Sequence, residues 1–245
     1  MAFLKLTVAY DGAAYAGWQV QPDKPTVQGV LTHAWRQITG ETPRLTASGR
    51  TDAGVHAEGQ TVGVETSATL DPSRLRKGLN AVLPDDVVVR LVEPAPRGFH
   101  ATHDALRKTY RYQLHDGAAP PLFDRRYVWW QRAGRLDDAA MGQGGATLVG
   151  RHDFACFQSV GSERSSTVRT ILDLRVRRAG DRVDVTVTGD GFLYNMVRAI
   201  AGTLVEVGRG ARPPEWVTEV LASRDRATAG PTAPPEGLVL VSVEY

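Results

Sequence analysis

The chain has 245 residues, of which 42% are hydrophobic and 23% charged, a balance ordinary for a globular protein of one large or two small domains. Its single cysteine, Cys156, excludes an intramolecular disulfide, the first residues lack the pattern of a secretory signal peptide, and no apolar run approaches the about 20 residues that span a bilayer. We therefore expect a cytoplasmic protein without membrane association, and the net charge of +2 says little about its partners.

The first hundred residues alternate between strand and helix patterns. Residues 3–10 carry apolar side chains at every second position, which predicts a half-buried strand. Helical spacing begins at Val27 with Thr26 as N-cap, and a second helix is predicted from Pro72 behind Asp71. Further strands are predicted at residues 44–47, 60–66 and 86–94. This order of elements is that of the ferredoxin-like fold.

The second half repeats this order loosely, although few residues are identical between the halves. Tyr110, Tyr112 and Leu114 share one face of a predicted strand, and an apolar stripe over 192–208 predicts a helix. The remaining elements are a glycine-weakened helix at 136–150, a hairpin over 170–189 that turns at 179–181, a short helix at 213–223, an irregular loop at 229–237 and a closing strand at 238–245.

These patterns predict an α+β protein made of two related halves. Residues 1–104 form the first ferredoxin-like half and residues 105–245 the second. We expect mainly antiparallel, RRM-like sheets with helices packed on one face of each.

Basic residues gather in four short segments rather than over the whole chain. These segments are residues 74–79, 106–112, 123–130 and 175–178. Two of them, 106–112 and 123–130, interleave arginine or lysine with tyrosine or tryptophan, which suits a polyanion whose bases stack on aromatic rings. A solvated strand face beside a core face explains each segment equally well.

Metal and cofactor motifs are missing from the sequence. His100 and His103 lie three residues apart, but no cysteine pair or carboxylate cluster completes a ligand set. The glycine-rich stretches lack the order and setting of a nucleotide-binding loop. Cys156 lies in an apolar setting that indicates an inert core thiol. We therefore expect no metal and no small-molecule cofactor.

The segment SGRTDAGVHA, residues 48–57, is the strongest candidate for chemistry. Gly49 and Gly54 bracket Asp52, which stands two residues after Arg50. A carboxylate held on such a loop can act as a nucleophile or base. The residues alone favour another interpretation, in which Asp52 shapes a turn or caps a helix.

ASGRTDAGVHA resembles the signature of the TruA-type tRNA pseudouridine synthases, and further motifs extend the resemblance over nearly the whole chain. These are VAYDGAAYAGWQVQP, FHA at 99–101, KTYRY at 108–112, GRHDFACF at 150–157, GFLYNMVRAIAGTLVEVG at 191–208 and AGPTAPPEGLVLVSVEY at 229–245. The resemblance implies an isomerase of tRNA processing that converts uridines 38, 39 and 40 of the anticodon arm to pseudouridine without a cofactor.

The resemblance also implies roles for individual residues. Asp52 matches the family's nucleophile, although attack on the base, attack on C1′ and a ribose-centred route all stay open. Tyr110 matches the residue that stacks on the target base, Arg50 the arginine associated with base flipping, and Arg198 the ion-pair partner of the aspartate. Leu238 or Leu240 supplies an apolar floor. The catalytic cleft is expected between the two halves, and the protein is expected to be a homodimer that binds tRNA across both subunits.

Two other functions fit parts of the pattern. A non-catalytic RNA-binding protein of RRM-like architecture would use the same sheet and aromatic residues, although neither half contains a convincing RNP1 string. A glycosidase-like hydrolase would need two paired carboxylates, whereas the motif offers one acid beside an arginine.

Overall fold

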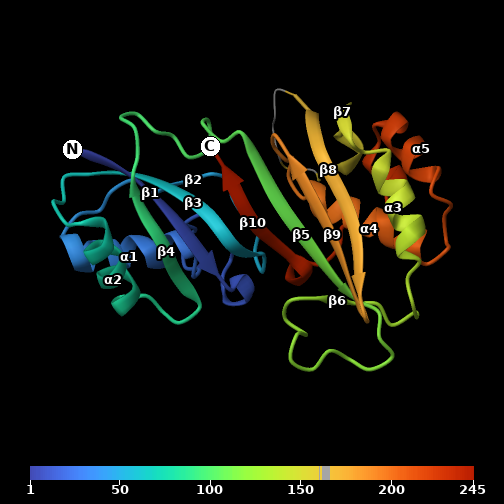
Figure 1. Cartoon of the computed structure of the whole chain (residues 1–245), viewed down its shortest axis with the longest axis horizontal. Coiled ribbons are helices and arrows are strands. Elements are labelled where there is room, and N and C mark those ends of the chain that lie inside the picture. The colour runs from blue at the N-terminus through green and yellow to red at the C-terminus, as the bar shows by residue number, and fades with distance from the viewer. Residues whose placement is uncertain (160, 162–165) are drawn as a thin grey trace. The chain divides into compact units, whose positions relative to one another are not determined.

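The computed structural model describes residues 1–159, 161 and 166–245 (Figure 1). The chain divides into two compact units, one formed by Met1–Leu106 with Val239–Tyr245 and the other by Arg107–Leu238. Both units contain helices and mainly antiparallel strands, so the expected α+β class is confirmed. Within the described residues, no helix is both long and apolar enough to cross a membrane.

The first unit is built on a sheet whose central strand is β1 (Ala2–Tyr10). It lies between β4 (Val87–Pro94) and β3 (His56–Thr66) and is antiparallel to both. The short β2 (Thr46–Ala47) is antiparallel to β3, whereas β10 (Leu238–Glu244) pairs with β3 in parallel through two residues. The order β4-β1-β3-β2 is the ferredoxin-like order that the sequence predicts.

Two capped helices accompany this sheet. Helix α1 (Val27–Thr39) begins after Thr26, whose hydroxyl oxygen accepts a hydrogen bond from the Gly29 amide. Helix α2 (Pro72–Val82) begins after Asp71, whose carboxylate accepts from two amides of the first turn. Both predicted caps are therefore confirmed, and each satisfies amides that a helix start leaves without a partner.

Alternation along β1 determines which face of the sheet is buried. Its even-numbered residues from Leu4 to Tyr10 are all buried, as the sequence predicts. Buried apolar side chains of the two helices and the neighbouring strands include Val27, Leu31, Trp35, Val62, Val64, Leu75, Leu79 and Val89. Each fully buried side chain of this size contributes about 1.5–3 kcal/mol, so this face is the core of the first unit.

The second unit contains an antiparallel sheet that begins with β5 (Arg107–His115). Next to it, in order, lie β9 (Arg182–Gly189), β8 (Val168–Ala179) and β7 (Gly150–Asp153), and the short β6 (Trp129–Trp130) pairs in parallel with the end of β5. The predicted hairpin between β8 and β9 is confirmed, with Gly180 in the left-handed region at φ +61°.

The helices of the second unit are α3 (Asp138–Ala146), α4 (Met196–Gly208) and α5 (Trp216–Ser223). Helix α4 is buried along most of its length, so it forms the centre of this unit's core. Short 3₁₀ helices lie at Gly12–Ala14, Ala155–Phe157, Arg226–Thr228 and Pro235–Gly237.

The structure differs from the sequence expectations in several places. Helix α4 begins at Met196 rather than 192, because Asn195 has the left-handed conformation (φ +60°). Strand β3 begins four residues earlier than expected, β2 is shorter, and α5 begins at Trp216. The division between the units lies near the expected residue 104, but β10 is counted in the first unit, where the sequence placed it in the second half.

Candidate active site

Asp52 lies on a loop that joins β2 to β3, residues 48–55, here called the Asp52 loop. Its side chain is partly exposed, between the buried Thr51 and the exposed Ala53. Arg50, two residues earlier on the same loop, is exposed. The loop therefore buries Ser48, Thr51 and Val55 in the unit, while Asp52 and Arg50 reach its surface.

A buried glutamine of β3 holds the beginning of this loop. The Gln60 amide nitrogen donates to the Gly49 carbonyl at 2.8 Å, and its amide oxygen accepts from the Ser48 hydroxyl at 2.7 Å. Gln60 and Ser48 have no exposed surface. Because buried polar groups are costly without partners, these bonds strongly favour one loop conformation.

A buried tyrosine of β1 holds the residue before Asp52. The hydroxyl oxygens of Tyr10 and Thr51 are 2.7 Å apart, and both side chains are buried. Burial raises the pKa of Tyr10 to about 12, although hydrogen bonds with Thr51 and Gln60 act in the opposite direction. The phenol is therefore neutral at pH 7 and keeps its proton for this contact.

Backbone contacts fix both sides of Asp52. The Trp18 amide donates to the Thr51 carbonyl at 3.0 Å, and the Gly54 amide donates to the Tyr15 carbonyl at 3.3 Å. Gly17 makes the close approach possible: its φ is +99°, and a Cβ there would lie 2.6 Å from the Thr51 carbonyl oxygen. The segment that precedes α1 thus packs against one side of the Asp52 loop.

His56, the first residue of β3, ties the end of the loop to the segment after β1. The Gly12 amide donates to its Nδ1 at 3.0 Å, and Asp11 Oδ1 lies 3.1 Å from the same nitrogen. Nδ1 without a proton accepts from the Gly12 amide, and Nδ1 with a proton donates to Asp11, so the two contacts use one nitrogen in different tautomers. In either form, His56 joins the end of the loop to residues 11 and 12.

Tyr110 lies in the middle of β5, opposite Val187 of β9. Its ring packs edge-on against Phe192 with 5.1 Å between ring centroids, and only 9% of the residue is exposed. The Tyr110 ring is therefore packed within the second unit as one partner of an edge-to-face aromatic pair. Stacking of Tyr110 on a base stays a prediction.

Arg198 lies in the first turn of α4, and its side chain anchors another segment. Its Nε donates to the Ala233 carbonyl at 2.7 Å, its Nη1 donates to Asn195 Oδ1 at 2.8 Å, and its own carbonyl accepts from the Ala233 amide at 3.1 Å. The left-handed Asn195 thus both begins the helix and orients the guanidinium.

The segment expected as an irregular loop, residues 229–237, is packed closely on α4. The Gly230 amide donates to the Thr203 hydroxyl at 2.9 Å, and a Cβ on Gly202 would lie 1.8 Å from the Pro231 carbonyl oxygen. Arg226 donates to the Gly230 carbonyl at 2.9 Å. Sequence patterns did not predict this packing, and its only signal is the pair of glycines at 202 and 230.

Both candidate leucines are buried. Leu238 is 6% exposed and directly follows the last 3₁₀ helix, whereas Leu240 is fully buried and pairs with Ala57 of β3. Asp52, Arg50 and Leu240 belong to the first unit, and Tyr110, Arg198 and Leu238 to the second. The structure brings Arg50 and Asp52 onto one loop. The cleft between the halves and the residue roles stay predictions.

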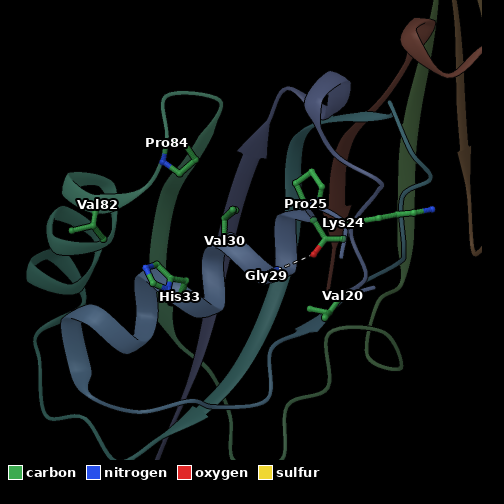
Figure 2. A pocket seen from close by; sticks show the side chains of 9 residues that line it. Val20, Lys24, Pro25, Gly29, Val30, His33, Val82 and Pro84 are labelled. Carbon is green, nitrogen blue, oxygen red and sulfur yellow. Dashed lines mark hydrogen bonds between the residues drawn. The ribbon is translucent and has the colours of Figure 1, made fainter. Parts of the chain in front are cut away.

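A separate pocket of about 320 Å³ lies in the first unit at the beginning of α1 (Figure 2). Its lining residues are Val20, Lys24, Pro25, Thr26, Gly29, Val30, His33, Val82 and Pro84. The amides of Val27 and Gln28 already donate to the Gly17 and Trp18 carbonyls, and the Gly29 amide to Thr26. The helix start therefore offers no ready anion site, and none of the predicted site residues lines the pocket.

Comparison with known proteins gives a consistent result over the full length. The family model described as tRNA pseudouridine synthase matches residues 6–104 and 146–245. The chain is 46% identical over 245 residues to tRNA pseudouridine synthase A of Brevibacillus brevis, and 47% identical over 248 residues to that of Moorella thermoacetica, with 100% of each chain covered. It is 44% identical to the Geobacillus kaustophilus protein of the same name, covering 99% of this chain and 94% of that one.

Proposed function

The chain belongs to the tRNA pseudouridine synthase family, and on that premise we propose that it converts uridines 38, 39 and 40 of the tRNA anticodon stem-loop to pseudouridine. In this isomerisation the N1–C1′ bond breaks and a C5–C1′ bond forms. The proton at C5 leaves and N1 gains one, so the composition of the nucleotide is unchanged. The observation that carries the proposal is the Asp52 loop, which presents a carboxylate on a scaffold fixed by buried hydrogen bonds.

We assign Asp52 as the nucleophile. Its loop is held through Gly49, Thr51 and Gly54, so the position of residue 52 is set before substrate arrives. Preorganisation of this kind lowers the cost of reaching the reactive geometry. Whether the carboxylate attacks the uracil ring or C1′, or acts in a ribose-centred route, it must be ionised.

The remaining residues handle the extruded nucleotide. A uridine inside a stacked stem is out of reach, so it must leave the stack. Arg50 is exposed two residues before Asp52 on the same loop, and we assign it to fill the vacated space and bind neighbouring phosphates. Tyr110 replaces part of the lost stacking, which is worth about 1–3 kcal/mol per base. Arg198 supplies a positive charge for Asp52, and Leu238 an apolar surface under the ring.

We further propose that the protein works as a cytoplasmic homodimer. A chain with a net charge of +2 has little excess positive charge for binding a polyanion, and a two-fold assembly gathers the basic segments of two subunits around one tRNA. Sedimentation should give a dimer at working concentrations, and a monomer that retains full activity would contradict this part of the proposal.

Release of tritium from C5 tests the function directly. Transfer RNA labelled at C5 of uracil should release tritium with wild-type protein as pseudouridine forms, and Asp52→Ala should bind the same tRNA without release. Asp23→Asn is a matched control, because this exposed acid of the same unit has a left-handed φ of 56° that asparagine tolerates. Its activity should equal that of the wild type.

The same experiment discriminates the other interpretations. Tight tRNA binding without release by the wild type would indicate the non-catalytic RNA-binding protein. Full release by Asp52→Ala would show that another residue is the nucleophile. Release at sites other than 38, 39 and 40, mapped by sequencing, would correct the substrate positions.

A further inference from the structure

The connection from β5 through β6, residues 117–132, exposes an unusual set of side chains. Phe123 is 90% exposed and Leu122 63%, and Tyr127 on the same turn is 37% exposed. Single exposed apolar residues are common on protein surfaces. Here three of them occur within six residues of one turn, and exposed apolar residues that cluster indicate an interaction site more strongly than single ones. We call residues 117–132 the aromatic loop.

Hydrogen bonds at both ends hold the aromatic loop on the second unit. The Gln113 side chain donates to the Tyr127 carbonyl at 2.7 Å, and the Trp130 indole donates to the Gly117 carbonyl at 3.0 Å. Within the loop, the Tyr127 amide donates to the Asp124 carbonyl at 2.8 Å. The Phe123 side chain is thus exposed to solvent on a hydrogen-bonded turn (residues 122–127).

The charge of the loop indicates the class of its partner. Residues 117–132 contain the arginines 125, 126 and 132 and a single acid, Asp124. The Arg132 guanidinium lies over the Trp130 ring, 4.8 Å from its centroid, and the Arg125 guanidinium donates to the Leu122 carbonyl at 2.6 Å. A guanidinium stacked on an aromatic ring, in the same loop as an exposed ring, is typical of surfaces that bind bases and phosphates together.

A second copy of this chain is the less favourable partner for the loop. A patch that lies on the axis of a two-fold dimer faces the same patch of the other subunit. Such an arrangement would bring the three arginines of each loop together, and like charges in an interface oppose association. An RNA brings negative charge to the arginines and a flat base to Phe123.

From these observations we propose that the aromatic loop is an RNA-contact element of the enzyme, in which Phe123 stacks on an unpaired or terminal base of the tRNA and the loop arginines bind flanking phosphates. The proposal rests on tRNA as the substrate of the proposed function. The loop follows β5, and His115 at the end of that strand lies five positions after Tyr110, about 17 Å of extended chain. We therefore expect its RNA contact to lie beyond the nucleotide that reacts.

Substitutions at Phe123 test the stacking. Equilibrium binding of full-length tRNA should weaken about tenfold in Phe123→Ser and in Phe123→Leu, because both remove the ring, whereas Phe123→Trp should bind like the wild type. Leu91→Ser is the control: Leu91 is 46% exposed on β4 of the first unit, and its replacement should leave binding unchanged. Since Phe123 is almost fully exposed, these variants should fold normally, which circular dichroism verifies.

Two further readouts define the partner. Arg132→Gln should lower the slope of log Kd against log salt concentration by about 0.7–0.9 for each phosphate that the variant no longer binds. Sedimentation of Phe123→Ser should match that of the wild type. The proposal is overturned if Phe123→Ser sediments as a smaller species than the wild type while Phe123→Leu sediments like the wild type. That result would show that the loop is a protein interface.

The outcomes separate this proposal from the proposed function. If wild type forms pseudouridine and every Phe123 variant binds tRNA equally, the loop proposal fails and the function stands. If wild type binds tRNA without turnover, and binding depends on the ring, the function fails and the loop proposal stands. If wild type binds no tRNA, both are wrong.

Discussion

The loop that carries Asp52 and the helix that carries Arg198 are held in place by different means. Around Asp52, Gln60 and Tyr10 bind residues 49 and 51, and the Trp18 amide binds the backbone beside them. In α4, the guanidinium of Arg198 itself makes the bonds, to the Ala233 carbonyl and to Asn195.

This difference determines what a substitution at each position reports. A change of the Asp52 side chain leaves the bonds made by Gln60, Tyr10 and the backbone in place, so activity can be lost while stability is kept. A change at Arg198 removes an anchor of residues 229–237 together with a charge, so stability and activity should change together. Measuring stability and activity for variants at Asp52 and at Arg198 tests whether the two positions differ in this way.

The largest effect is expected for Asp52→Asn, which keeps the shape of the side chain and removes its charge. Turnover should fall by about 10³-fold or more, as for other nucleophiles, while the thermal midpoint should stay within about 2 °C of the wild type. Single-turnover kinetics and calorimetry measure the two. A drop in the midpoint of about 5 °C or more would show that the side chain is also part of the scaffold.

Arg198→Met should lose both activity and stability. We expect turnover to fall about 100-fold with a smaller change in tRNA affinity, and the unfolding free energy to fall by about 2–4 kcal/mol because charged hydrogen bonds are removed. Urea unfolding and single-turnover assays check this. Arg198→Lys keeps the charge without the planar fork, so it should recover more activity than stability. Equal stability of Arg198→Met and the wild type would show that Arg198 does not anchor residues 229–237, so Asp52 and Arg198 would not differ in this respect.

Gln60→Leu should convert the Asp52 loop from rigid to mobile. The buried Ser48 hydroxyl and Gly49 carbonyl would lose their partner, which costs about 2–4 kcal/mol. Because Asp52 is then less well positioned, kcat should fall about tenfold with KM little changed. Because burial favours the neutral carboxylic acid, Gln60→Glu keeps an acceptor for Ser48 and a hydroxyl donor for Gly49, so its kcat should lie between those of Gln60→Leu and the wild type. Unchanged kcat in folded Gln60→Leu would show that these bonds do not position Asp52.

The smallest effect is a change in the pH dependence of stability in the first unit. Burial raises the pKa values of Tyr10 and Tyr245 to about 12 from the ordinary value of 10. Between pH 10 and 12 the unfolded chain releases these protons and the folded chain keeps them, so the unfolding free energy falls as pH rises, by up to about 1.4 kcal/mol per pH unit and tyrosine.

Tyr10→Phe should therefore make this decline shallower between pH 10 and 12. At pH 7 it should cost about 1 kcal/mol, because the hydrogen bond with the Thr51 hydroxyl is removed. Addition of Tyr245→Phe should flatten the decline further. Urea titrations at a series of pH values measure it, and an unchanged slope in the double variant would exclude both phenols as its cause.

Local sequence signals predicted most of the elements correctly. Thr26 and Asp71 mark the starts of their helices because a side-chain oxygen satisfies the first amides, and the alternation in β1 follows directly from burial of one face. Asp52 could be singled out only through the family resemblance, since a carboxylate between glycines also suits a simple turn.

Features that depend on distant parts of the chain could not be predicted. Nothing local to Gln60 indicates that it binds Gly49 and Ser48, and the start of α4 depends on Asn195, which bonds to Ser159 and Arg198. The packing of residues 229–237 on α4 rests on two glycines that a sequence pattern treats as flexible positions. Most of these interactions join residues that are remote in sequence, so local patterns in a single sequence do not predict them.

The parallel pairing of β10 with β3 has a consequence for biosynthesis. Val239 and Leu240 lie beside His56 and Ala57, the residues that follow the Asp52 loop, yet the whole second unit lies between them in the chain. The first sheet therefore cannot gain β10 until the second unit has been synthesised. A nascent chain that has not passed the second unit lacks a neighbour of the loop on which the proposed chemistry depends. Completion of the first sheet is in this way coupled to synthesis of the second unit.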